Sequence, residues 1–212
     1  MAEAMGLRER KKLQTATRIY RTAVALFAEK GFDHVSVQEI ADAADVSKMT
    51  VFNYFGTKED LVFKPMEEHF SDAARAVRER APGESAVEAV RRQLLDMIEA
   101  RDPSVGLHSE PFARRIRAVV MATPVLRERA YLLSEKGARE LADLLTEETG
   151  DTTPALIAAA TLTAARQALV EEHHLRIDAG ESVDEVAADA AQLAERAFAL
   201  VEGGLKDYAR KE

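Results

Sequence analysis

The sequence predicts an all-α protein with a small N-terminal three-helix head, containing a helix-turn-helix, and a larger helical bundle after it. Three observations lead to this fold class. Residues 35–61 carry closely spaced helix-capping signals, the remainder reads as successive helices without an alternating strand pattern, and 212 residues with 47% hydrophobic content can bury a substantial core. We expect the two domains to be 1–57 and 58–212.

The first short helix is marked by its N-terminal signals. Ser36 followed three residues later by Glu39 forms a capping box, and Val35 with Ile40 occupies the positions of a hydrophobic staple. The helix is therefore predicted to begin just after Ser36. It ends at about Ala44, because a second N-cap follows closely.

That second N-cap is Ser47, with Val46 and Val51 as its own staple pair. The second helix is predicted to begin at Lys48. It ends before Gly56, the residue type best suited to the left-handed position after a helix. Two short helices joined by a tight turn are typical of a helix-turn-helix.

The next helix starts near Lys58, after a further capping signal from Thr57 and Asp60. Pro65 falls about seven residues into it, where its ring meets the carbonyl of Leu61 and one backbone hydrogen bond is lost. The sequence predicts a kink there. The kink is either a hinge between the domains or a static bend.

The second helix presents an outward face that needs an explanation. Val51 and Phe55 lie four apart and are predicted to face the preceding helix. The side chains left pointing outward are Lys48, Met49, Thr50, Phe52 and Asn53. Amino, amide and methyl groups of these types suit base edges in the major groove, so DNA reading is one interpretation. The other is that two capped helices merely close a helical subdomain.

The segment from Ile19 to Leu61 resembles the tetracycline-repressor (TetR) family of bacterial regulators. The matching motifs in chain order are Phe27-Ala28-Glu29-Lys30-Gly31-Phe32, Ile40-Ala41, Ala44, Val46-Ser47, the aromatic group Phe52, Tyr54 and Phe55, and Lys58-Glu59-Asp60-Leu61. This resemblance implies a regulator that binds a double-stranded DNA operator. A DNA head without sequence-specific binding, on a protein that binds ligands or partners, is the alternative.

Three positions depart from the family pattern. Asp45 stands where the turn usually has Gly, and Asp tolerates the left-handed conformation better than most residues. Met49 replaces a frequent small residue. Phe52 replaces a frequent Tyr and cannot make the phosphate hydrogen bond of a Tyr hydroxyl, so only an apolar or stacking contact is expected from it.

The resemblance implies two groups of DNA-contacting side chains. Those expected nearest the bases are Lys48, Thr50 and Asn53, with Met49 and Phe52 as further DNA-binding candidates on the same outward face. Those that clamp phosphates on either side of the groove are Ser36, Tyr54 and Lys58. Phosphate contacts fix the register, whereas base contacts select the sequence.

Charge is unevenly distributed. Residues 1–64 hold 10 Lys and Arg against 9 Asp and Glu, whereas residues 65–212 hold 19 against 28, within a total net charge of −8. An acidic body repels DNA and leaves the near-neutral head as the docking surface. A basic cluster precedes the first helix and is either a poorly ordered solvated terminus or an arm along the DNA; it comprises Arg8, Arg10, Lys11 and Lys12.

Several classes of protein find no support in the sequence. It has no Cys, no run that resembles a signal peptide and no apolar run long enough for a membrane span, so we expect a cytoplasmic protein that does not contact the membrane. Glu171 and His174 have the spacing of a di-iron motif, but only one copy occurs. We therefore expect neither catalysis nor a metal or other cofactor.

The last two long helices are predicted at about 154–178 and 183–202 and are rich in alanine. In relatives this helix pair meets its copy in a four-helix interface, so the resemblance implies a homodimer through 154–202. A dimer requires a palindromic operator. The alternative is that both helices pack wholly within one subunit.

The region from about Met66 to Val170 is where the resemblance places a small-molecule effector of unknown identity. Apolar candidates to line its cavity are Met66, Phe70, Met97, Phe112, Ile116, Met121 and Tyr131. Each is otherwise explained as plain core. Arg166, in an apolar helix, is the polar candidate for the effector, and a buried salt bridge explains it equally well. The resemblance favours a repressor that an effector releases from its operator.

Overall fold

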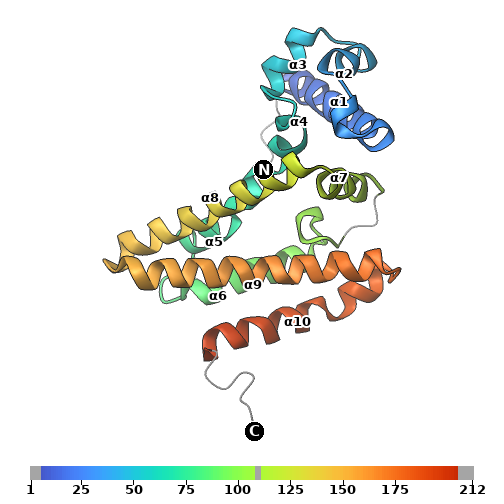
Figure 1. Ribbon diagram of the computed structural model, residues 1–212. Helices are drawn as coiled ribbons and strands as arrows, with labels where there is room; N and C mark the ends of the chain where they lie inside the picture. Colours follow the sequence, from blue (N-terminus) through green and yellow to red (C-terminus); the bar gives the residue numbers. More distant parts are fainter. Residues whose placement is uncertain (1–5, 108–110, 205–212) are drawn as a thin grey trace. The chain divides into compact units, whose positions relative to one another are not determined.

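A computed structural model describes residues 6–107 and 111–204, and within those ranges it contains helices and no strand, which confirms the predicted fold class (Figure 1). The α-helices are α1 (Leu7–Lys30), α2 (Val37–Ala43), α3 (Lys48–Phe55), α4 (Asp60–Phe63), α5 (Asp72–Arg78), α6 (Ala86–Glu99), α7 (Pro111–Ala122), α8 (Pro124–Thr149), α9 (Thr152–Asp178) and α10 (Val183–Gly203). The 3₁₀ helices are η1 (Phe32–His34), η2 (Lys64–Ser71) and η3 (Pro103–Val105).

The chain divides into two compact units, which differ from the expected division at 57 and 58. The head unit comprises residues 1–67 and 110–131, and the body unit comprises 68–109 and 132–212. The head is larger than expected because α7 packs against α1. There the Phe112 ring meets Tyr20 edge-on with centroids 5.3 Å apart, and the Arg21 guanidinium lies 5.6 Å from the centre of the same ring.

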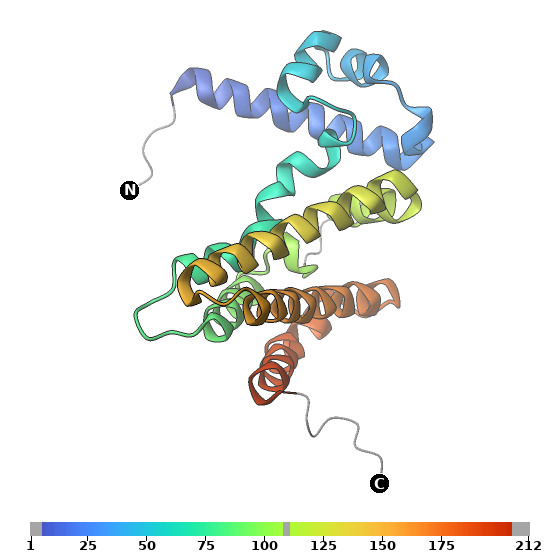
Figure 2. The same cartoon turned by 60° about the vertical axis from the view of Figure 1, so that its left-hand side comes forward.

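In the head unit, α1 crosses beneath α2 and α3 (Figures 1 and 2). The crossing buries an apolar core in which Phe27 of α1, Ile40 of α2, Val51 and Phe55 of α3 and Leu61 of α4 are each at most 5% exposed. Burial of these side chains is the main force that holds the short helices in place.

Helix α1 begins earlier than the sequence suggested. It starts at Leu7, so the basic cluster Arg8, Arg10, Lys11 and Lys12 consists of exposed residues on the first turns of a regular helix. The expectation of a poorly ordered terminus is therefore wrong from Leu7 onward. The alternative, that these residues lie along DNA, stays a prediction.

The predicted kink at Pro65 is a change of helix type. Helix α4 begins at Asp60, later than expected, since Thr57 and Asp60 first exchange two hydrogen bonds of 3.1 Å between side chain and backbone. The α-helix ends at Phe63, and η2 continues to Ser71 before α5 begins. Pro65 lacks the N–H that an α-helix would need, which explains why the α-helix stops here.

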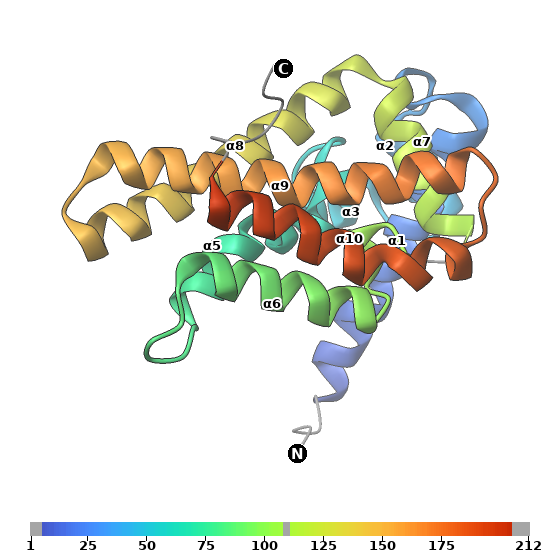
Figure 3. The ribbon, with the colours of Figure 1, turned by 90° about the horizontal axis from the view of Figure 1, so that it is seen from below.

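In the body unit, α6 and α9 run in the same direction and α10 returns antiparallel to both (Figures 1 and 3). Their shared core includes Leu94, Leu162, Leu169 and Phe198, all at most 4% exposed. The last two helices follow their predicted bounds closely. Their largest buried side chains serve the core of their own subunit.

Helix α8 and η2 touch backbone to backbone at Gly137. A methyl group added at Gly137 would lie 1.9 Å from the carbonyl oxygen of Phe70. Beside this contact, Ser71 Oγ donates a 2.7 Å hydrogen bond to Glu140 Oε2. Only glycine permits this approach. Among the described residues no helix is long and apolar enough to cross a membrane.

Replacing Gly137 by Ala should lower the free energy of unfolding by about 1–3 kcal/mol, because α8 must move away from Phe70. Without that clash, Gly to Ala inside a helix would stabilise by up to about 1 kcal/mol. Gly203→Ala is the matched control, since a methyl group there meets nothing within 4 Å. Urea unfolding of both variants measures the difference, and equal effects would contradict the close approach.

Candidate nucleic-acid interface

The helix-turn-helix has the two N-caps that the sequence predicted, but the capping box at Ser36 is incomplete, because the Glu39 carboxylate pairs with Lys30 instead. Ser36 Oγ accepts a 3.1 Å hydrogen bond from the Glu39 N–H, and Ser47 Oγ accepts one of 3.0 Å from the Thr50 N–H. Both helices begin where expected, at Val37 and Lys48. The caps satisfy N–H groups that would otherwise lack partners, so the short helices have defined starts.

The turn between α2 and α3 uses Asp45 in the left-handed conformation, with φ of 50°. The chain closes behind it through a 3.0 Å hydrogen bond from the Val46 N–H to the Ala41 carbonyl. This 6→1 bond is typical of a helix that ends at a left-handed residue. The predicted tolerance of Asp for this position is thereby confirmed.

Helix α3 presents the expected face to solvent. Val51 and Phe55 are buried, whereas Met49 is 66% and Phe52 39% exposed. Lys48 and Asn53 are also exposed. Exposing a Met beside a Phe to water is unfavourable on a surface that has no binding partner. Both side chains suit contact with thymine methyl groups in the major groove.

Two of the outward side chains have partners on their own helix. Lys48 Nζ lies 6.0 Å from the centre of the Phe52 ring, within reach of a cation–π interaction. Thr50 is half-buried, and its Oγ1 lies 2.8 Å from Ser47 Oγ. Phe52, which cannot bond a phosphate, thus contacts a side chain expected at the bases.

The expected phosphate clamps lie in different surroundings. Ser36 is exposed and its Oγ serves as a helix cap. Tyr54 is half-buried, and its carbonyl accepts a 2.7 Å hydrogen bond from Lys64 Nζ. Lys64 is exposed at the start of η2 and was not among the predicted residues, because it lies outside the motifs that match the family.

Lys58 is committed to the interior of the head unit. Its Nζ donates a hydrogen bond to the Phe32 carbonyl and lies 4.3 Å from the centre of the Phe32 ring and 5.7 Å from that of Phe27. Burial lowers the pKa of Lys58 although Asp33 raises it. In this arrangement the ammonium group anchors the turn after α1, and its predicted phosphate contact would require it to leave these partners.

Charge is more sharply divided between the structural units than between the expected domains. The head unit contains 15 Lys and Arg and 12 Asp and Glu, whereas the body unit contains 14 and 25. The head gains three arginines from α7, namely Arg114, Arg115 and Arg117. A net positive head and a strongly acidic body favour DNA contact through the head alone.

The predicted effector-lining residues fall into both units. Those in the head unit are Met66, Phe112, Ile116, Met121 and Tyr131; those in the body unit are Phe70, Met97 and Arg166. Met121 and Tyr131 are 47% and 63% exposed. Phe112 packs on Tyr20 of α1. Five of the eight therefore belong to the head unit, and the effector-lining role of the set stays a prediction.

Arg166 forms the salt bridge that was its alternative explanation. Its Nη2 lies 2.5 Å from Asp72 Oδ2, and its Nη1 donates a 3.2 Å hydrogen bond to the His69 carbonyl. Asp72 is fully buried and also pairs with Arg75 and with His69 Nδ1. Burial alone would raise the pKa of Asp72, but the His69 hydrogen bond and the charge of Arg166 outweigh it and lower the pKa.

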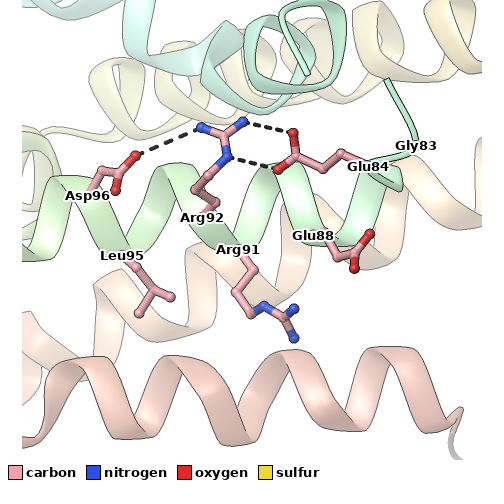
Figure 4. Close-up of a pocket in the computed structure, with 7 residues that line it drawn as sticks. All are labelled: Gly83, Glu84, Glu88, Arg91, Arg92, Leu95 and Asp96. Carbon is pink, nitrogen blue, oxygen red and sulfur yellow. Dashed lines mark hydrogen bonds and ion pairs between the residues drawn. The ribbon is translucent and has the colours of Figure 1, made fainter. Parts of the chain in front are cut away.

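A surface depression on α6 has a different character (Figure 4). It has a volume of about 390 Å³ and is lined by Gly83, Glu84, Glu88, Arg91, Arg92, Leu95 and Asp96. Arg92 Nε pairs with Glu84 Oε1 at 2.8 Å, and Arg92 Nη1 lies 3.8 Å from Asp96 Oδ2. The depression is lined mainly by charged groups that pair with one another, so it is poorly suited to an apolar effector. In the part of the chain described, no cluster of side chains suits a metal ion.

Two capped helices, an exposed α3 face and a net positive head are the features expected of a helix-turn-helix DNA-binding head. Residues 19–64 match the family model described as "Bacterial regulatory proteins, tetR family", so this segment is similar to proteins of that family. The matching relatives are named as HTH-type transcriptional regulators.

Individual relatives agree with this similarity. The HTH-type transcriptional regulator TcmR of Streptomyces glaucescens is 33% identical over 85 residues, which cover 40% of this chain and 38% of TcmR. The chain spans less than two thirds of the length of the curated relatives it matches.

Two solved structures share the fold. NalD, the secondary repressor of the MexAB-OprM multidrug efflux pump in Pseudomonas aeruginosa, has a TM-score of 0.61 and 23% identity over 94% of this chain and all of its own. The SmeT–triclosan complex has a TM-score of 0.57 and 16% identity, and the match covers 88% of this chain and 90% of the SmeT chain. At these identities the likeness shows the fold alone.

Asp45→Gly should raise the free energy of unfolding by up to about 1 kcal/mol, because glycine adopts a φ of 50° without steric cost. Asp45→Val should lower it, since a β-branched side chain opposes this conformation. Chemical unfolding monitored by circular dichroism measures both. A destabilised Gly variant would show that the Asp side chain contributes more than the backbone geometry does.

His69→Gln should reduce stability more at low pH than at high pH. The Asp72 hydrogen bond raises the pKa of His69 against burial, with Asp102 adding to the rise and Arg166 opposing it. The charged ring therefore stabilises the fold fully below its unfolded pKa of about 6.5, and this contribution is lost as pH rises through the folded pKa. Urea unfolding at pH 5.5 and 9, with His34→Gln as control, tests this; a pH-independent difference would contradict it.

Proposed function

We propose that this protein is a TetR-family repressor that binds a palindromic operator as a homodimer and leaves it when a small molecule binds the body unit. It would act in the cytoplasm, where a regulator meets its operator. The observation that carries the proposal is the exposed, capped α3 with Lys48, Met49, Phe52 and Asn53 facing solvent. NalD, which shares the fold, is described as a repressor, and SmeT as a complex with triclosan.

The homodimer is supported by an exposed face of α9. Small and apolar residues follow one another there at helical spacing and are Ile157, Ala160, Thr161, Ala164 and Ala168. Ile157 is 63% and the neighbouring Leu156 40% exposed. On α10, Leu200 is 48% exposed. Small residues allow close approach of helices, and apolar exposure of this kind suits an interface between two copies.

Ala164→Arg should weaken the dimer at least about a hundredfold, because it buries an unpaired charge in an apolar contact, at a cost of about 3 kcal/mol. Ala25→Arg on the exposed surface of α1 is the matched control and should leave the dimer intact. Sedimentation across a concentration series gives the dissociation constants. Dimers of equal strength would move the interface away from α9.

Binding to DNA from upstream of the protein's own gene tests whether the protein recognises a specific sequence. The wild-type protein should bind one palindrome at least about 10³-fold more tightly than unrelated DNA, as specific regulators do. Its affinity should fall steeply between 50 and 200 mM salt. Thr50→Ala/Asn53→Ala should lower operator affinity by at least about thirtyfold, since each base contact is worth about 1–3 kcal/mol. Thr152→Ala, at an exposed threonine of the body unit, serves as control.

The alternative is a head that no longer selects a sequence. Asp45, Met49 and Phe52 are the departures that favour it. In that case wild type and double variant bind every duplex equally and weakly, and no footprint appears. Such a result would reject the repressor and leave a helical protein that binds ligands or partners.

A further inference from the structure

Four buried side-chain atoms in the described part of the chain have no hydrogen-bond partner. They are Gln93 Oε1, Thr163 Oγ1, Arg166 Nε and His173 Nε2. Buried polar groups are normally paired, and an unpaired one costs stability. These unpaired atoms therefore call for an explanation.

The four atoms belong to facing surfaces of two helices. Thr163, Arg166 and His173 are spaced by three and seven residues, so they share one face of α9. Gln93 lies one turn before Met97 on α6, and Met97 Sδ is 3.6 Å from Arg166 Nη2. Helices α6 and α9 run in the same direction (Figures 1 and 3), so the turn that carries Gln93 lies alongside the turn that carries Thr163.

The unpaired atoms offer both kinds of hydrogen bond. Arg166 Nε is a donor, Gln93 Oε1 is an acceptor and the Thr163 hydroxyl is either. His173 is fully buried, and its Nδ1 lies 2.8 Å from the Val105 carbonyl oxygen. Since a carbonyl only accepts, Nδ1 is the donor, and in the neutral ring Nε2 remains an acceptor.

Charge at this site favours an oxygen ligand. The single carboxylate of Asp72 faces two guanidinium groups, those of Arg75 and Arg166. Arg75 is partly exposed to water, whereas the side chain of Arg166 is only 14% exposed. Of the two guanidinium groups, that of Arg166 is thus the one that solvent screens least.

We propose that Gln93, Thr163 and Arg166 form the polar end of an internal site for a small amphipathic molecule bearing an acceptor oxygen, either a carboxylate or a hydroxyl. Arg166 Nε and the Thr163 hydroxyl bind that oxygen, and Met97, a flexible side chain, adapts to the apolar remainder. This inference rests on the proposed effector function, since it names the chemical class of the effector.

The test compares octanoate, 1-octanol and octyltrimethylammonium, which share a chain and differ in the head group. The arginine Nε–H signals of the ¹⁵N-labelled full-length protein are recorded during titration, with Arg166 assigned from its Lys variant. Octanoate and 1-octanol should shift the Arg166 signal, and the ammonium compound should not. If neither oxygen compound shifts it, or all three do so equally, the proposal is overturned.

Two variants separate binding from folding. Thr163→Val and Gln93→Met each remove an unpaired atom without touching the Asp72 ion pair. Each should raise the Tm while weakening octanoate binding about threefold to tenfold, the effect of one hydrogen bond. Thr146→Val is the matched control, because Thr146 Oγ1 already donates a 2.8 Å hydrogen bond to the Ala142 carbonyl. A lower Tm with unchanged octanoate binding would assign both groups a structural role and reject the site.

Operator binding, measured without any compound, keeps this inference separate from the proposed function. Specific operator binding without an Arg166 response to oxygen compounds rejects the site and leaves the repressor. An Arg166 response without operator binding keeps the site and rejects the repressor.

Discussion

Burial of the Asp72 carboxylate is the constraint on which the arrangement of the body unit depends. A charge with no exposed surface is tolerable only if cations and hydrogen-bond donors surround it, since an unpaired one costs several kcal/mol. Asp72 begins α5, and its partners come from three elements: His69 of η2, Arg75 of α5 and Arg166 of α9. Of these partners Arg166 is the one that comes from α9, so its ion pair with Asp72 holds α9 against the η2–α5 segment.

That segment is also where the chain passes between its two units. The chain crosses from one unit to the other after residues 67, 109 and 131, so η2 and α8 each contain a crossing. Within the body unit, η2 and α8 are held together by the contact of Gly137 with Phe70 and by the hydrogen bond from Ser71 to Glu140. On the head side, Arg129 of α8 lies 3.7 Å from Asp60, the first residue of α4. A displacement of η2 against α9 would therefore be passed to α8 as well.

Local signals in the sequence predicted the short helices of the head, whereas contacts between distant parts of the chain could not be predicted, for a physical reason. Caps such as Ser36 and Ser47, and the left-handed Asp45, depend on near neighbours in the chain, so the bounds of α2 and α3 and the outward face of α3 followed from the sequence. The return of α7 to α1, and the pairing of Asp72 with Arg166, 94 residues further on, depend on tertiary packing, for which a single sequence carries no local signal. The effector-lining residues are divided between the two units, because Met and aromatic residues indicate burial without indicating which helices meet, and their role stays a prediction.

The 3₁₀ form of η2 bears on how a change in the body could reach the head. A 3₁₀ helix rises about 2.0 Å per residue against 1.5 Å for an α-helix, so the eight residues of η2 would shorten by about 4 Å on becoming α-helical. Pro65 opposes that change at the first turn, where it lacks the N–H that an α-helix needs. The adjustable part is then the stretch after Pro65, which ends at the His69 carbonyl and Asp72 held by Arg166. Pro65 as a hinge stays a prediction, and any such change of helix type would fall after the proline, in the stretch whose end pairs with Arg166.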